Sequence, residues 1–256
     1  VGDSSSVTAK ITTTSDAAFS KVTDISATGS AFAAIRTDGS VVTWGNTQDG
    51  GDSSSVASAI NGSSDPTDVV QVYATTSAFA ALQKNGAVVT WGDVNNGGSS
   101  SSVSTSLNGQ VDVNKIFSTS TAFAALKSDG SLITWRNANN GGNSSSVTSD
   151  LNGTTDITKV FSTNTAFAAI NTNNKVMTWG YGAYGGDSSS VAALINGSLD
   201  ADCISTSASV SSGGTLTING GSIELSIDAN YSGITTSINN TTYNLGQNFT
   251  NGTALP

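Results

Sequence analysis

Short apolar segments and polar turns alternate along the chain in a pattern that occurs four times. Each copy contains a small, apolar segment built on Ala-Phe-Ala-Ala, then a polar turn, then a segment that ends in Thr-Trp. The paired segments are residues 30–35 and 41–45, 77–82 and 88–92, 121–126 and 132–135, and 165–170 and 176–180. The four tryptophans lie 47, 44 and 44 residues apart, so each copy contains one. A fixed period of this size predicts one supersecondary unit, repeated so that neighbouring units bury each other's apolar faces.

Each unit is predicted to contain three strands. The first is rich in β-branched and aromatic residues, as in residues 69–74, a composition typical of strands. The Ala-Phe-Ala-Ala segment is the second, and its alanines indicate that a neighbouring sheet approaches closely. Asp-Gly or Asn-Gly joins it to the third strand, because both residues favour the positive φ of hairpin turns. The fourth unit has Asn173-Asn174 at this turn.

A short helix is predicted to close each unit. A Gly-Gly pair and a serine run follow each tryptophan loop, and then two apolar residues stand four positions apart, as in Val56 and Ile60. This spacing places both side chains on one face of a helical turn. Asp, Asn or Ser before the turn is typical of N-capping, and Asn-Gly after it is typical of C-capping. The sequence therefore predicts a helix of one or two turns that depends on packing for its stability.

The repeats divide the chain into two predicted regions. Residues 1–205 form the repeat domain, with four full units, a helical tail of a unit at 1–7 and the start of a fifth unit at 202–207. The two partial units fit either a closed ring or an open array. Residues 206–256 form a C-terminal β segment, in which residues 215–218 and 222–227 alternate polar and apolar around a turn and predict a hairpin. This segment is expected to serve assembly, by donating a strand to a neighbouring sheet.

Composition narrows the classes of function. Charged residues make up 11% of the chain and the formal net charge is −9, so there is no cationic footprint for nucleic acid. No apolar run is long enough to span a membrane, and membrane insertion is not expected. Polarity that comes from hydroxyl and amide groups suits an extracellular or cell-surface protein.

Catalytic residue types are scarce. The chain has no histidine, one glutamate (Glu224) and one cysteine (Cys203). A general base that works near neutral pH is therefore missing, and Cys203 has no histidine to activate it. We expect no enzymatic activity and no cofactor, and we expect Cys203 to be a small buried residue, with a reactive thiol as the alternative.

Acidic loop residues raise the question of calcium. Asp3, Asp49, Asp52 and Asp187 lie in the Gly-rich exits or beside them, and carboxylates with loop carbonyls are calcium ligands. The residue that corresponds to Asp52 is a serine or an asparagine in the next two units. Capping explains all three residue types equally well, so the sequence favours capping and no metal site.

The hairpin and exit motifs resemble those of a known family. The first copy of the motif runs from Asp38-Gly39 through Trp44-Gly45 to Gly50-Gly51, and it has three counterparts. This motif is similar to the repeats of the regulator of chromosome condensation superfamily, which bacterial β-lactamase-inhibitor propellers share. The resemblance covers about residues 1–205 and implies four-stranded blades around an axis, a β-propeller. The chain departs from the pattern in lacking the blade-start histidine and the Gln-Leu exit, and Arg136 follows Trp135. The family includes exchange factors, inhibitors, adhesins and ligand binders, so membership leaves function open.

Aromatic residues suggest two kinds of surface. The Phe and Trp of each unit are predicted to face inward against adjoining units, with a sugar-stacking surface as the alternative for the tryptophans. Tyr181 and Tyr184 lie in the last tryptophan loop, where the other units have polar residues. Because the repeat does not require aromatic residues there, this pair is the candidate contact patch for a protein or glycan ligand.

Sequons indicate candidate glycosylation. Asn-x-Ser/Thr occurs at Asn61, Asn143, Asn152, Asn196, Asn230, Asn239, Asn240, Asn248 and Asn251. Occupied sequons would place those loops at the surface of a secreted glycoprotein. The favoured hypothesis is a structural or adhesive repeat protein that assembles with copies of itself through β-edges. The alternative is a lectin-like or inhibitor-like propeller that binds a ligand with loops on one face.

Overall fold

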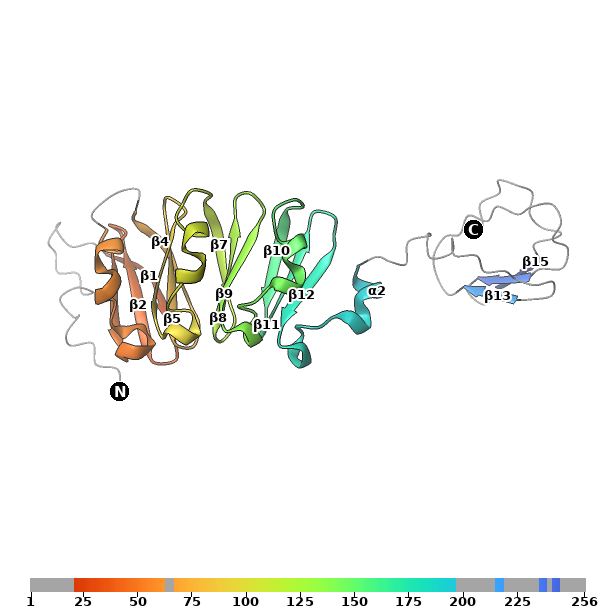
Figure 1. Cartoon of the computed structure of the whole chain (residues 1–256), viewed down its shortest axis with the longest axis horizontal. Helices are drawn as coiled ribbons and strands as arrows, with labels where there is room; N and C mark the ends of the chain where they lie inside the picture. The colour runs from red at the N-terminus through yellow and green to blue at the C-terminus, as the bar shows by residue number, and fades with distance from the viewer. Residues whose placement is uncertain (1–20, 63–66, 197–214, 219–234, 239–240, 245–256) are drawn as a thin grey trace. The chain divides into compact units, whose positions relative to one another are not determined.

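The computed structural model describes residues 21–62, 67–196, 215–218, 235–238 and 241–244. The chain divides into two compact units, Val1–Val191 and Ala192–Pro256. The described residues are mostly β, as predicted. In the first unit, four sheets follow one another in chain order (Figure 1).

Each repeat forms a three-stranded antiparallel sheet whose strands pair in chain order. The strands are β1 (Val22–Ala27), β2 (Ala31–Arg36), β3 (Val41–Gly45), β4 (Val69–Ala74), β5 (Ala78–Gln83), β6 (Val88–Gly92), β7 (Val113–Ser118), β8 (Ala122–Lys127), β9 (Leu132–Arg136), β10 (Ile157–Ser162), β11 (Ala166–Asn171) and β12 (Val176–Gly180). The three strands predicted for each unit are confirmed. The second and third strands are joined by a turn glycine at φ between 71° and 75° in the first three repeats, and by Asn174 at φ 60° in the fourth.

Short helices follow each sheet. They are η2 (Thr47–Gly51), η3 (Ser54–Ala59), η4 (Val94–Asn96), η5 (Ser101–Ser106), η6 (Ala138–Asn140), η7 (Ser145–Asp150), η8 (Gly182–Tyr184) and η9 (Ser189–Val191). All are 3-10 helices except η2, a π-type turn. The predicted closing helix is thus present. The apolar residue that ends it is buried as Ile60, Leu107 and Leu151 in the first three repeats.

The number of strands per blade differs from what the resemblance implied. The sheets have three strands, and the place of a fourth is taken by single bridges, Ser40 to Asn61 and Ala87 to Asn108. The outer edge of the third strand is met by the end of the closing helix, as where the N–H of Val41 donates to the carbonyl of Ile60 at 2.8 Å. The residues that would make a fourth strand are wound into the 3-10 helix, so only one residue remains to pair.

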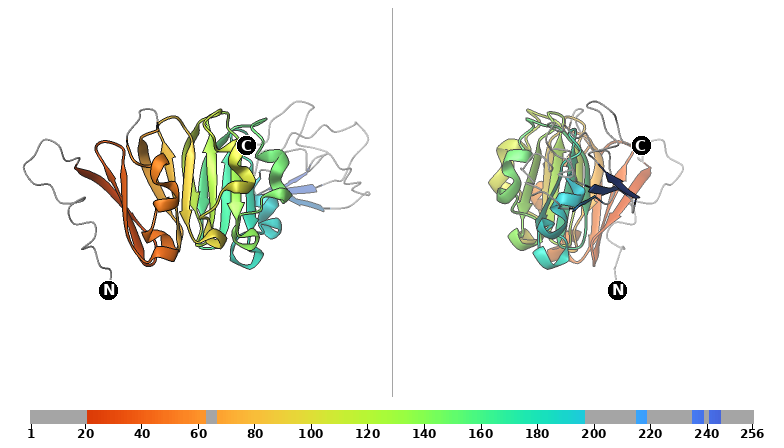
Figure 2. Two further views of the ribbon diagram at one scale, coloured as in Figure 1. Left: turned by 60° about the vertical axis from the view of Figure 1, so that its left-hand side comes forward. Right: turned by 90° about the vertical axis from the view of Figure 1, so that its right-hand side faces the viewer.

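The hydrophobic core lies between successive sheets. One core cluster joins Ala80 and Leu82 of β5 to Ile116, Phe123 and Trp135 of the following sheet. Equivalent clusters join the first sheet to the second and the third to the fourth. Ala80 and Leu82 of β5 lie in one cluster and Phe79 and Ala81 in another, so alternate residues of this strand face opposite neighbours. The small alanine side chains let the sheets, which follow one another in Figure 2, approach closely.

The second unit contains α2 (Ala192–Ile195), β13 (Thr215–Ile218), β14 (Thr235–Ile238) and β15 (Thr241–Asn244). β13 pairs with β14 in parallel, and β14 pairs with β15 antiparallel. The predicted hairpin partner of β13, residues 222–227, lies outside the described residues. None of the helices in the described part is long and apolar enough to cross a bilayer.

Candidate functional site

The loop that follows each tryptophan is held by one threonine hydroxyl. In the fourth repeat, Thr163 Oγ1 donates to the carbonyl of Tyr184 at 3.3 Å. Thr75 and Thr119 make the same bond at 2.7 and 2.9 Å to the residues equivalent to Tyr184, namely Asn96 and Asn140. The loop carrying the predicted contact patch therefore has the same anchor as the loops before it.

The fourth loop differs from the others at its first residue. In the earlier loops a polar side chain caps the turn, as where Asp93 accepts from the N–H of Asn95 at 2.7 Å and Asn137 from that of Asn139 at 3.1 Å. Tyr181 stands at this position in the last loop, and no side-chain cap is formed. A capping interaction has thus been replaced by an aromatic ring.

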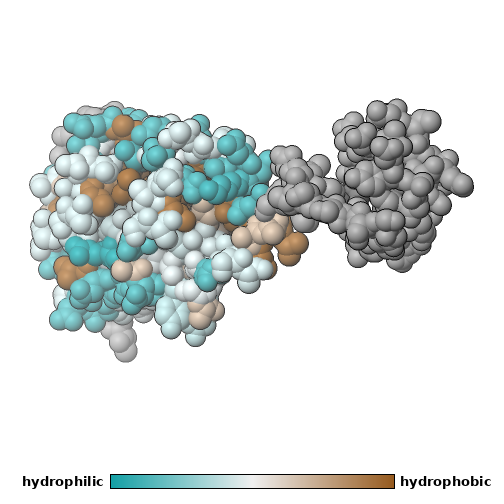
Figure 3. Space-filling model, turned by 45° about the vertical axis from the view of Figure 1, so that its right-hand side comes forward, coloured by the Kyte–Doolittle hydropathy of each residue, from teal (hydrophilic) through white to brown (hydrophobic). Residues whose placement is uncertain are grey.

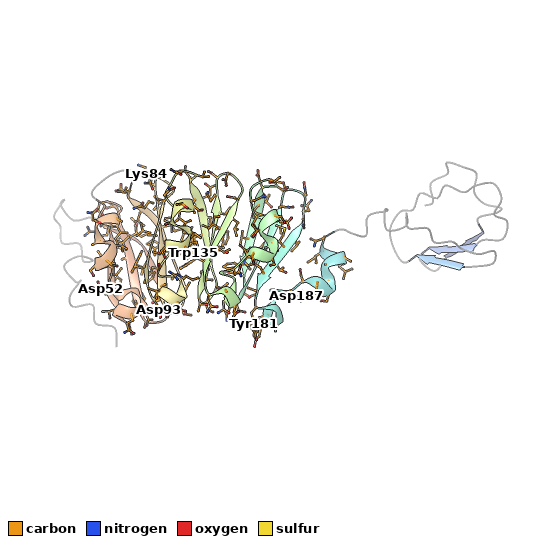
Figure 4. The ribbon with its side chains drawn as sticks, in the orientation of Figure 1. Asp52, Lys84, Asp93, Trp135, Tyr181 and Asp187 are labelled. Carbon is orange, nitrogen blue, oxygen red and sulfur yellow. The ribbon has the colours of Figure 1, made fainter. Side chains whose placement is uncertain are left out.

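Tyr181 and Tyr184 come together as an exposed aromatic pair. Their ring centroids are 5.3 Å apart at an interplanar angle of 25°, and the residues are 47% and 66% exposed. Figure 4 shows Tyr181 at the loop end of the fourth sheet, whereas Trp135 lies between sheets. Stacked, exposed tyrosines offer an apolar platform with hydroxyl groups, suited to a sugar ring or an apolar side chain.

The acidic exits act as caps where the structure describes them. Asp52 accepts from the N–H of Ser54 at 2.9 Å, and Asp187 accepts from that of Ser189 at 2.8 Å. Asn143 makes the same bond to Ser145, as capping predicts. These backbone N–H groups lower the pKa of Asp52 and of Asp187. Asp3 lies outside the described residues.

Asp49 makes a different contact, since it accepts a hydrogen bond from the hydroxyl of Ser30. Within the described ranges, no three His, Cys, Asp or Glu side chains gather as metal ligands would.

Of the predicted glycosylation sites, four fall in the described residues. Asn61, Asn143 and Asn152 are exposed and Asn196 is half-buried. The others, and both Cys203 and Glu224, are outside the described ranges. Asn61 and Asn152 come shortly after the closing helices η3 and η7, and Asn143 lies between η6 and η7, so all three exposed asparagines are accessible.

Successive sheets are joined by a repeated contact that sequence reasoning missed. The indole Nε1 of Trp91 donates to the carbonyl of Gly50 in the preceding loop at 3.0 Å. Trp179 donates to Gly141 at 3.0 Å in the same way, and Trp135 donates to Gly97 at 3.2 Å. Each buried tryptophan is therefore satisfied by the repeat before it.

The same glycines leave room for the next repeat's phenylalanine. Gly141 has φ 97°, and a Cβ placed there would lie 2.5 Å from the ring of Phe167. At Gly50 a Cβ would lie 2.6 Å from the ring of Phe79. We call this combination of a glycine carbonyl, a phenylalanine ring and a tryptophan N–H the blade joint. The Gly-Gly pairs in the sequence were its signal, because a side chain at the first glycine would exclude the neighbouring ring.

The prediction that the Phe and Trp rings face inward is confirmed in three repeats and is wrong in the first. Phe79, Phe123 and Phe167 and their tryptophan partners are buried in the blade joints. Phe32 is 41% exposed and Trp44 is half-buried, although the two rings stack at 5.2 Å like the others. The reason is that these rings face away from the second sheet, and the described residues contain no sheet before β1.

The departure at Arg136 is also explained. Arg136 stands where the other repeats have glycine and adopts the left-handed backbone, with φ 79°. Its Nε donates to the carbonyl of Ser99 in the preceding loop. The side chain thus adds a hydrogen bond across one blade joint, at the expense of a strained backbone.

These features define an array of RCC1-like β-propeller repeats: four three-stranded sheets, each followed by short 3-10 turns. No family model matches the chain, and no curated protein matches it either. It is similar to the ectodomain of the Physcomitrella patens receptor kinase CR4, with 14% identity and TM-score 0.42 over 66% of this chain and 43% of that one.

Two further solved structures are similar. Human WBSCR16 has 16% identity and TM-score 0.42, over 66% of this chain and 50% of that one. Prp20p of Saccharomyces cerevisiae has 19% identity and TM-score 0.40, over 62% and 43%. The chain thus spans about half the length of these proteins. They include a receptor-kinase ectodomain and a protein described by its binding to Gsp1p and histones, so the likeness indicates no specific function.

Proposed function

We propose that this chain is a non-enzymatic structural or adhesive repeat protein of the extracellular space or cell surface, which associates with copies of itself. The observation that carries the proposal is apolar surface at both ends of the sheet array. Ile25 on β1 is 54% exposed and Phe161 on β10 is 56% exposed. The equivalents of Ile25 in the other sheets, Val72, Ile116 and Val160, are buried in the core.

Exposed large apolar residues in neighbouring strands mark interaction surfaces. Ile25 and Phe32 lie on paired strands of the first sheet, where Ile25 pairs with Ala34. On the face drawn in Figure 3, hydrophobic residues form small, separate patches between hydrophilic ones. Association that buries these two end surfaces would give the first and fourth sheets a second neighbouring sheet, as the two middle sheets already have.

The extracellular assignment is supported by the low charge and by the exposed sequons. Charged residues are 11% of the chain, and Asn61, Asn143 and Asn152 are exposed. Intact mass of protein secreted from a glycosylating host tests this point. An added N-glycan mass that falls by one glycan in Asn152→Gln supports it, and an unmodified mass in such a host contradicts it.

Self-association is tested by sedimentation velocity of the whole chain across a range of protein concentrations. We expect the weight-average sedimentation coefficient to rise with concentration and to change little with salt, because the surfaces are apolar. A single monomeric species at every concentration would contradict the proposal.

A ligand-binding role is the second candidate, and the exposed Tyr181–Tyr184 pair favours it. A glycan array or a pull-down is the direct test. Specific binding that is lost in Tyr181→Ala with Tyr184→Ala, and kept in Ala183→Ser of the same loop, supports this role. Binding that the double variant retains contradicts it.

A further inference from the structure

The blade joint is directional, and its two halves are displayed separately at the two ends of the array. Inside the chain, each sheet offers a glycine loop to the sheet that follows and a Phe–Trp pair to the sheet that precedes. The first sheet has no preceding sheet and the fourth has no following sheet among the described residues. Each end therefore carries one half of a joint that the chain forms three times internally.

The fourth sheet carries the receiving half. Gly185 has φ 102°, as Gly141 has 97°, but no heavy atom lies within 4 Å of a Cβ placed there. Phe161 is exposed where its equivalents Tyr73 and Phe117 pack against the following sheet. The glycine loop is thus formed and open.

The first sheet carries the inserting half. Phe32 and Trp44 are stacked at 5.2 Å like the ring pairs inside the array. In the described part of the chain, the indole of Trp44 is the one without a glycine carbonyl as acceptor. Together with Ile25, these rings reproduce the surface that Val72, Phe79 and Trp91 bury in the first joint.

A row of backbone hydrogen bonds is open at the same two ends. Gly29 N–H donates to Thr76, Thr76 to Ser120, and Ser120 to Asn164, at 2.8 to 2.9 Å. These four residues are equivalent in the four repeats. Among the described bonds, the carbonyl of Gly29 accepts none and the N–H of Asn164 donates none. In the described part of the chain, the Asn164 N–H and the Gly29 carbonyl are thus the unpaired ends of this row, and their direction matches the bonds inside it.

One edge of the joint is less complementary. Inside the array, the turn glycine of one sheet lies against an aspartate of the next, as Gly130 lies against Asp156. At the ends these positions are Asn174 and Lys21. A Cβ at the turn prevents close approach at this edge, so a joint between ends is weaker than an internal joint and reversible.

We propose that a second copy of this chain docks its first sheet on the fourth sheet of the first copy, head to tail, by forming a fourth blade joint. This deepens the proposed self-association and rests on it, but places the contact on sheet faces rather than on strand edges. Within the printed sequence, residues 1–20 and 197–256 contain no tryptophan. The first and fourth sheets lie at opposite ends of the sheet series (Figure 2), so Trp44 of the same chain does not reach the Gly185 loop.

Such a contact is heterologous, so it propagates into rings or filaments. The test uses the whole chain with Gly185→Ala, which blocks the receiving half, and Phe32→Asp, which blocks the inserting half. Gly182→Ala is the matched control, because a Cβ there meets only Asp187 Cβ at 3.5 Å, an ordinary contact. Far-UV circular dichroism checks that each variant is folded.

We expect the protein concentration at which half of the chains are assembled to rise about tenfold or more in Gly185→Ala and in Phe32→Asp. It should stay unchanged in Gly182→Ala. A mixture of the two blocked variants retains one intact pair of halves and should give dimers and no larger species. Acrylamide quenching of the fluorescence of Trp44, which is half-buried in the isolated chain, should fall as wild-type protein assembles.

The outcomes separate the two proposals. If wild-type protein assembles but both blocked variants assemble equally well, the head-to-tail joint is wrong while self-association stands. If wild-type protein stays monomeric at all concentrations, the proposed function fails together with the joint.

Discussion

Single residues at the loop exits decide whether the sheets can meet. The sequence predicted a buried Trp in each unit, which Trp91, Trp135 and Trp179 confirm and the half-buried Trp44 contradicts. It did not predict that their N–H groups bond to glycine carbonyls one repeat earlier, because periodicity shows which residues are equivalent and not which neighbour they contact. Trp44 has the same local sequence, and its exposure depends on what precedes it in space.

At the residue scale, the lowered pKa values of two carboxyl groups make the free energy of unfolding depend on pH in the acid range. The Ser131 hydroxyl lowers the pKa of Asp129, and the Ser54 N–H lowers that of Asp52. The folded pKa lies below the unfolded value, so this stability is present above about pH 4 and is lost as pH falls through the folded pKa. Denaturant unfolding from pH 2 to 8 measures it.

We expect a nearly flat free energy of unfolding between pH 5 and 8, since the chain has no histidine. Asp129→Asn should weaken the loss below pH 4, because asparagine does not titrate. An acid transition of the same size in this variant would show that Asp129 has no part in it.

The turn at Asn174 offers a stabilising change. Asn174 has φ 60°, where the other repeats have glycine. Asn174→Gly should raise the free energy of unfolding by about 0.5–1 kcal/mol, because glycine adopts the left-handed region without steric penalty. Asn173→Gly is the control and should give no gain. Thermal and denaturant unfolding measure both, and lower stability in Asn174→Gly would contradict the explanation.

At the scale of elements, the sequence predicted three strands and a closing helix in each repeat, and both are present. The hairpins were predictable because Asp-Gly and Asn-Gly determine their turns locally. The absence of a fourth strand was not predictable, because the expectation of four strands came from the resemblance. The serine runs instead form 3-10 helices, whose hydrogen bonds are local. The Tyr181–Tyr184 stack follows from a departure from the repeat that the sequence does show.

A hydroxyl pair ties each third strand to its closing helix. Thr90 Oγ1 donates to Ser100 Oγ at 3.2 Å, and three equivalent pairs lie at 2.9 to 3.0 Å. Thr90→Val and Ser100→Ala should each lower the free energy of unfolding by about 1 kcal/mol. Their combination should lose less than the sum, because both remove one bond. Ser102→Ala, an exposed serine of η5, is the control; fully additive losses would show that the pair does not interact.

At the scale of the whole molecule, the described repeats form a series in which the main contacts between sheets join successive sheets. Stability then depends on the sheets and on the joints between them. A substitution that breaks one joint should therefore lower the free energy of unfolding of the series. The same substitution at an unfilled joint should lower it only by the cost of the local backbone strain. Gly141 and Gly185 make this comparison possible, because they are equivalent positions with similar φ and different surroundings.

The most direct test of the blade joint is the free energy of unfolding of Gly141→Ala and Gly185→Ala, measured at protein concentrations low enough for the monomer. Alanine at positive φ should cost about 1–2 kcal/mol at either position. At Gly141 the clash with Phe167 should add about 1–3 kcal/mol. A clearly larger loss at Gly141 is the result predicted, and equal losses in the two variants would contradict the joint.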